Sequence, residues 1–128
     1  MTNLAAVASA VRALRGATTL DHDDESEMTE RVQALVKAMI ARNQIEHDDI
    51  ISMIFTATDD LVCAFPAAAA RAAGLGDVPL LCARELSVVG GTPRCVRVLM
   101  HVSTERTRSE LRHVYLEGAA GLRDDLPG

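Results

Sequence analysis

The residues best suited to chemistry lie between positions 82 and 100, a stretch that predicts two strands joined by a Gly-Gly-Thr-Pro turn. The second strand, 94–102, is mostly apolar and β-branched, yet it carries Arg97 in its middle. A strand does not normally place a guanidinium among core residues without a partner for the charge. Two interpretations stay open. Either Arg97 lies on the solvent face of an edge strand, or it forms an anion site in which Glu85 and Cys82 face the same pocket.

The other polar residues favour binding of a small polyanion over covalent or metal chemistry. The sequence holds no G-x-S-x-G, P-loop or G-x-G-x-x-G motif. Its cysteines form no C-x-x-C pair and its histidines no H-x-x-x-H pair, so we expect no structural metal. No histidine is placed to act as the base for a cysteine nucleophile. What remains is one tyrosine, one strand-borne carboxylate and several arginines on strands or at their ends: Tyr115, Glu85, Arg15, Arg97 and Arg123.

Composition and charge limit the class of protein. The 128 residues suffice for one domain with a core of Ala, Val, Leu, Ile and Met, because aromatic residues make up only 2%. A net charge of −5 argues against nucleic acid as a partner. No apolar run approaches the roughly 18 residues of a membrane-spanning helix, and the cysteine usage suits the cytoplasm.

Hydrophobic periodicity and turn residues predict five strands and two main helices. Acidic residues at 21–27 suit a helix N-terminus, and apolar residues at helical spacing extend that helix to about Asn43. We further expect strands at 10–18 and 50–57, an alanine-rich helix from Phe65-Pro66 to Gly74, the strand pair above, a helical turn within 104–112 and a last strand at 114–122. Two main helices cannot cover both faces of such a sheet, so the uncovered face should meet another copy of the chain. Residues 1–128 are predicted to form one domain, with 1–9 as an extension and 124–128 as a tail.

Several short motifs occur in order from about Val11 to Leu126. They are Arg15-Gly16-Ala17-Thr18-Thr19, Phe65-Pro66-Ala67, Val78-Pro79, Cys82 with Glu85, Gly90-Gly91 with Cys95-Val96-Arg97-Val98, Arg112-His113-Val114-Tyr115-Leu116-Glu117 and Leu122-Arg123. With these motifs at nearly constant spacing, the sequence resembles the monofunctional, trimeric chorismate mutases of the Bacillus type. The resemblance implies an α+β fold, with a five-stranded mixed sheet and two main helices. It also implies a homotrimer in which three sheets form a barrel-like core and the active sites lie at subunit interfaces.

The resemblance further implies an isomerase that rearranges chorismate to prephenate in aromatic amino acid biosynthesis, without a cofactor. By matching position, Arg97 would donate to the ether oxygen, while Glu85 and Cys82 would contact the ring hydroxyl. The remaining substrate-binding residues implied are Arg15 and Tyr115 for carboxylates, Phe65, Ala67, Leu80 and Leu81 for the pocket lining, and Leu122 and Arg123 as a closing segment.

Each of these candidate site residues also has a purely structural interpretation. Two other functions stay open as well. A trimeric enamine/imine deaminase would explain the fold and one arginine but not Glu85, Tyr115 and Arg123 together. The other is a non-catalytic subunit that binds a metabolite or a partner protein through the same cleft. The sequence also departs from the Bacillus-type pattern, which can place a Lys near a substrate carboxylate where this chain has Ala68.

Overall fold

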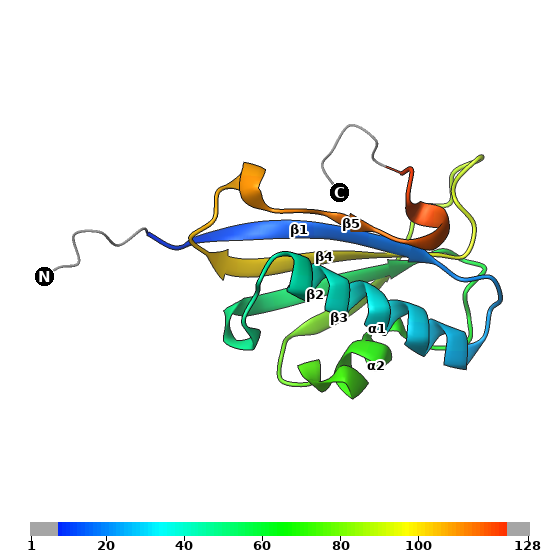
Figure 1. Cartoon of the computed structure of the whole chain (residues 1–128). Helices are drawn as coiled ribbons and strands as arrows, with labels where there is room; N and C mark the ends of the chain where they lie inside the picture. Colours follow the sequence, from blue (N-terminus) through cyan, green and yellow to red (C-terminus); the bar gives the residue numbers. More distant parts are fainter. Residues whose placement is uncertain (1–7, 123–128) are drawn as a thin grey trace, which may run out of the picture.

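The computed structural model describes residues 8–122, which form one five-stranded sheet with helices beside it (Figure 1). The strands are β1 (Ala10–Thr19), β2 (Ile50–Ala57), β3 (Leu80–Arg84), β4 (Cys95–Thr104) and β5 (Val114–Tyr115), and the helices are α1 (Glu25–Arg42) and α2 (Pro66–Ala70). The strand order is β3-β2-β4-β1-β5. Because β4 is antiparallel to both neighbours while β3 and β5 are parallel to theirs, the sheet is mixed. The predicted α+β sheet with two helices is confirmed.

Helix α1 begins and ends where its capping residues predict. The Asp24 carboxylate accepts a hydrogen bond from the Glu27 N–H at 2.9 Å, which satisfies one of the free donors of the first turn. Beyond the last turn, the buried Asn43 side chain donates to the Met39 carbonyl and to the Arg112 carbonyl, both at 2.9 Å. The helix is therefore fixed at both ends, and its C-terminal cap also holds the segment that leads into β5.

Both helices cover the same face of the sheet (Figure 1). Val96, Val98 and Met100 of β4 are buried in the core that α1 and α2 share with this face. A Cβ on Gly16 of β1 would lie 2.4 Å from the Met39 sulfur, so a larger residue here would displace the buried Met39 side chain of α1. The alternate residues of β4, including Arg97 and Leu99, are half-buried on the opposite face, which we call the open face. No helix within residues 8–122 is long and apolar enough to cross a membrane.

The predicted pairing of the strands on either side of the Gly-Gly-Thr-Pro turn is wrong. Strand β2 lies between β3 and β4, because the long α2 connection lets β3 pair in parallel with the outer edge of β2. A tight turn does form, with the Gly91 N–H donating to the Val88 carbonyl at 2.9 Å, but it lies inside a loop that crosses the end of β2. Strand β4 is central, so the edge-strand interpretation of Arg97 is also wrong.

The last strand is much shorter than the predicted 114–122. β5 ends at Tyr115, and Glu117 adopts a φ of +53°, which turns the chain into a 3₁₀ turn at Glu117–Ala119. A side-chain-bearing residue rarely adopts the left-handed region, and the sequence gives no signal for it here. The expected extension at 1–9 and tail at 124–128 fall largely outside the described residues.

Candidate functional site

Arg97 lies on the open face, in the middle of the central strand. Its backbone is paired with Thr56 of β2 on one side and Ala17 of β1 on the other. The Arg97 Nε lies 2.5 Å from a carboxylate oxygen of Glu85. Glu85 follows the end of β3, and its N–H donates to the Ala57 carbonyl at 3.0 Å, so the strand pairing continues far enough to direct this carboxylate to the open face. The side chains of Arg97 and Glu85 are 42% and 23% exposed, although the Arg97 Nε atom itself is buried and its contact with Glu85 is an ion pair without hydrogen-bond geometry.

Two further predicted site residues share the open face with this ion pair. Tyr115 is paired with Ala17, which is itself paired with Arg97, so the register aligns the three residues across the sheet. The Tyr115 hydroxyl is buried and has no hydrogen-bond partner among the described residues. Arg15 is exposed and lies two positions before Ala17, so it projects from the same face. We call Arg15, Glu85, Arg97 and Tyr115 the open-face group.

Cys82 and Phe65 lie elsewhere, in a cleft of about 860 Å³ at the edge of the sheet. This edge cleft lies between the loop that follows β2, the start of α2 and the outer strand β3, and its lining includes Cys63, Phe65, Ala68, Cys82 and Arg84. The Phe65 side chain is 70% exposed. The cleft combines an aromatic ring, small apolar side chains and the Arg84–Asp59 ion pair, whose atoms lie 3.2 Å apart, and Glu25 also lines it, which suits a compact ligand with polar groups.

Cys82 and Glu85 therefore do not face the same pocket in one chain, contrary to the sequence prediction. Cys82 is paired with Phe55, which is fully buried on the helix-covered face, whereas Glu85 meets Arg97 on the open face. The two residues are three positions apart along extended backbone, and side chains at an odd separation point to opposite faces. One chain thus presents the open-face group and the edge cleft on two sides of its sheet.

The other predicted lining residues are divided between the core and the open face. Ala67 is 3% exposed and packs in the core, and Leu80 is paired with the buried Met53, so neither lines the edge cleft. Leu81 projects from the open face and is 61% exposed. Leu122 packs against a small buried cluster that includes Ala17 on the open face. Arg123 lies outside the described residues.

Cys63 of the edge cleft and Cys95 of β4 are not activated nucleophiles. Burial, followed by a hydrogen bond to Asp23, raises the pKa of the Cys63 thiol to about 11, so the thiol stays protonated at neutral pH. Burial also raises the pKa of Cys95. Within residues 8–122, no group of three or more His, Cys, Asp or Glu side chains could hold a metal ion. The arrangement suits recognition of an anion by fixed charges.

The acidic residues 21–27 have a further role that the sequence did not predict, beyond forming the N-terminus of α1. The Asp23 carboxylate accepts hydrogen bonds from the Val62 and Cys63 N–H groups, both at 3.0 Å, and so holds the loop that lines the edge cleft. The Glu27 carboxylate accepts from the Asp21 N–H at 2.6 Å and the His22 N–H at 3.0 Å. The number of acidic residues in this segment was the only sign of these contacts in the sequence. Their carboxylates bind backbone N–H groups, and those bound by Asp23 lie far away along the chain.

Comparisons with known proteins agree with this architecture. Residues 11–126 match the family model described as chorismate mutase type I. The chain is 40% identical over 117 residues to the chorismate mutase AroH of Bacillus subtilis, covering 91% of this chain and 92% of that protein. It is 43% identical to the chorismate mutase AroH of Thermus thermophilus, over 91% of this chain and 96% of the relative. A solved chorismate mutase from Clostridium thermocellum superimposes with a TM-score of 0.83 at 46% identity, covering 84% of this chain and 96% of that one. The chain belongs to the type I chorismate mutase family.

Proposed function

We propose that this chain, as a single domain, converts chorismate to prephenate by an intramolecular [3,3] rearrangement. The observation that carries the proposal is the Arg97 guanidinium, which the central strand presents on the open face with its Nε 2.5 Å from Glu85. Membership of a family whose members are named chorismate mutases supports the same function.

The rearrangement requires only that the substrate is held in its reactive conformation and that the developing charge is stabilised. Chorismate is a flexible dianion that must be held in a compact conformer before the bond rearrangement occurs. As the C–O bond breaks ahead of C–C formation, negative charge develops on the ether oxygen and must be stabilised by fixed donors. A fixed guanidinium supplies such donors, and its planar fork stays charged at all relevant pH values.

The open-face group supplies the charged contacts in this proposal. Arg97 donates to the ether oxygen, and Glu85 holds the Arg97 guanidinium and faces the electron-poor ring. Arg15 and Tyr115 bind the substrate carboxylates. For Tyr115 the support is its buried hydroxyl, which has no hydrogen-bond partner in the described part of the chain and could donate to a bound oxygen.

The edge cleft supplies the other half of the site, and we propose that it comes from a neighbouring copy of the chain. Phe65 and Cys82 would then contact the ring face and hydroxyl of a substrate held by the open-face group of the next subunit. A head-to-tail interface of this kind closes into a ring, and a homotrimer is the assembly we propose. The open face supports this arrangement, because it carries apolar side chains such as Leu81 with no helix over them.

Ala68 provides a test of the cleft's contribution. It is exposed and lines the edge cleft on α2, where it offers the substrate no charge. Ala68→Lys should lower KM for chorismate by about threefold to tenfold and leave kcat within about twofold, because a carboxylate contact stabilises substrate and transition state alike. Steady-state kinetics measures both parameters.

Ala68→Gln is the matched control for this substitution. It adds a side chain that is also long and suits a helix but carries no charge, so KM should stay near the wild-type value. If Ala68→Lys raises kcat tenfold at constant KM, position 68 acts in the transition state and this division of roles is wrong. If both parameters stay fixed in the Lys variant, Ala68 does not face the substrate.

The loss of chorismate's ultraviolet absorbance tests the function itself. The wild-type chain should consume chorismate without a cofactor, and kcat should vary little between roughly pH 6 and 9, because the reaction transfers no proton. The Cys63 thiol, with a pKa of about 11, does not titrate in this range. Chorismate that remains unchanged would support a non-catalytic subunit. A bell-shaped profile centred near neutrality would indicate proton transfer and favour a deaminase-like enzyme.

A further inference from the structure

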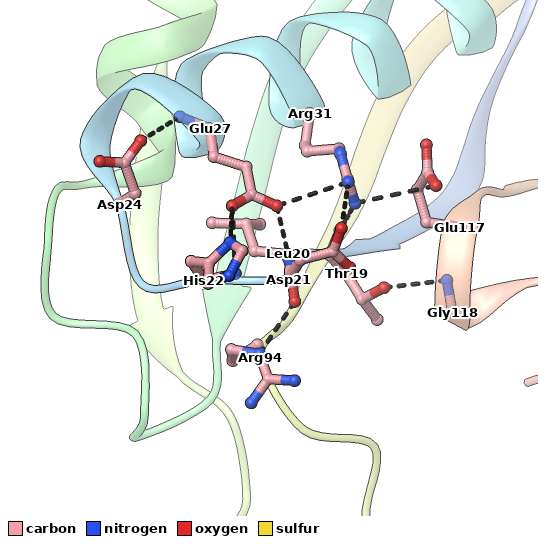
Figure 2. Close-up of polar contacts among 10 residues, drawn as sticks. All are labelled: Thr19, Leu20, Asp21, His22, Asp24, Glu27, Arg31, Arg94, Glu117 and Gly118. Carbon is pink, nitrogen blue, oxygen red and sulfur yellow. Dashed lines mark hydrogen bonds and ion pairs between the residues drawn. The ribbon is translucent and has the colours of Figure 1, made fainter.

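The segment that follows β5 is tied back to β1 and α1 by contacts that the proposed reaction does not use (Figure 2). The Gly118 N–H donates to the Thr19 hydroxyl at 2.9 Å. The Arg31 guanidinium donates to the Thr19 carbonyl at 2.6 Å and lies 3.8 Å from the Glu117 carboxylate. We call Thr19, Arg31, Glu117 and Gly118 the C-terminal clasp.

The backbone of the clasp has an unusual shape for its sequence. Glu117 adopts a φ of +53°, a conformation that is unfavourable for a residue with a side chain and persists only where surrounding contacts hold it. At the next position a Cβ would lie 2.7 Å from the Thr19 hydroxyl oxygen, so the chain approaches Thr19 more closely than any residue but glycine allows. The φ of Glu117 and the missing side chain of Gly118 therefore both allow close contact with the end of β1.

Arg31 is itself held in place. Its side chain is 16% exposed, and it lies 3.1 Å from the Asp21 carboxylate and 3.4 Å from the Glu27 carboxylate. Glu27 also accepts a hydrogen bond from the Asp21 N–H at 2.6 Å. The acidic cluster at the start of α1 therefore fixes the guanidinium that binds the Thr19 carbonyl, and Figure 2 shows this set of contacts around the end of β1.

The clasp adds to a small set of other contacts that hold this segment. β5 has only two residues, and beyond it the Leu116 N–H donates to the Ala17 carbonyl at 2.9 Å. The buried Ala119 packs with Ala17 on the open face, and Tyr115 and Leu122 pack against the same cluster. A strand this short is too weak by itself to fix the positions of residues 116–122.

We propose that Thr19 is a positioning residue of the site. Through the Gly118 N–H its hydroxyl holds the segment after β5, and so fixes Tyr115 and Leu122 over the open face. This inference rests on the proposed function, because it assigns the clasp a role in binding chorismate.

Thr19→Val removes the hydroxyl and keeps the shape of the side chain. Losing one neutral hydrogen bond should raise KM for chorismate by about threefold to tenfold. We expect kcat to stay within about twofold, since the carboxylate contact of Tyr115 stabilises substrate and transition state alike. Thr19→Ser keeps the acceptor and should restore the wild-type KM, which a defect in packing alone would not predict.

Two further variants separate positioning from general stability. The Thr104 hydroxyl accepts a hydrogen bond from the Arg106 N–H at 3.1 Å, at the far end of the sheet, so Thr104→Val is the same substitution on the same kind of contact. It should leave KM unchanged. Gly118→Ala loosens the clasp from the other side, by steric conflict with Thr19, and should raise KM as Thr19→Val does.

Amide hydrogen exchange reports on the clasp without using the activity. The Ala119 and Leu122 N–H groups are hydrogen-bonded within the held segment, and both should exchange at least about tenfold faster in Thr19→Val than in wild type. Unchanged exchange overturns the inference, and so does faster exchange with KM within twofold of wild type. Failure of the proposed function itself is a different result, because wild-type protein would then leave chorismate unchanged before any variant is made.

Discussion

Replacing Arg97 with alanine is expected to lower kcat by at least about 10²-fold, the usual scale for removing one donor to a developing oxyanion. The guanidinium is fixed before the reaction by the central strand and by Glu85, 2.5 Å from its Nε. Donors that need no reorganisation favour the transition state over the flexible ground state, so the loss should fall mainly on kcat. Steady-state kinetics at saturating chorismate measures it.

Two control variants distinguish a loss of catalysis from a loss of the fold. Arg97→Lys keeps a positive charge beside Glu85 and should recover part of kcat, because it restores the charge without the planar fork. Arg42→Ala removes an exposed arginine at the end of α1, away from the open-face group and the edge cleft, and should leave kcat unchanged. An Arg97→Ala enzyme with near-normal kcat would show that this residue does not meet the reacting atoms.

The second large effect is expected in the edge cleft, where Phe65→Asp should lower kcat/KM by at least about 10²-fold, since like charges brought together at an interface cost several kcal/mol. Phe65 is 70% exposed in the cleft and is the N-cap of α2. Aspartate is a better N-cap than phenylalanine, so the variant should fold at least as well as wild type. Its carboxylate would repel the dianionic substrate.

Phe65→Asn is the matched control, because it caps the helix equally well without a charge. It loses the ring contact but not the attraction of the site for an anion, and should therefore lose less activity than Phe65→Asp. If both variants keep kcat/KM within about threefold of wild type, the edge cleft does not contact the substrate.

The sequence predicted best the features that local physics decides. Helix α1 follows from the acids at its first turn and an apolar face at helical spacing, and both are local signals. Strand β2 follows from an apolar, partly β-branched run at Ile50–Ala57. The order of the strands could not be predicted from local sequence patterns, because the pairing of β3 with β2 depends on how the α2 connection packs.

The site was predictable to a similar depth. Arg97 stood out because a charge in an apolar strand needs an explanation. Its alignment with Tyr115 depends on the register of three strands through Ala17, which no local pattern contains. The opposite orientations of Cys82 and Glu85, by contrast, follow from strand alternation alone and could have been read from their spacing. That spacing is the reason why the proposed site draws on two copies of the chain.

Mixing two inactive variants tests most directly the claim that the site is shared between copies. Arg97→Ala damages the open-face group and Phe65→Asp damages the edge cleft, so each variant should be nearly inactive alone. In equal co-refolded mixtures, light scattering should report the homotrimer that we propose. About a quarter of the interfaces should then pair an intact open-face group with an intact cleft, giving about a quarter of wild-type activity. A mixture no more active than its two components would contradict the shared site.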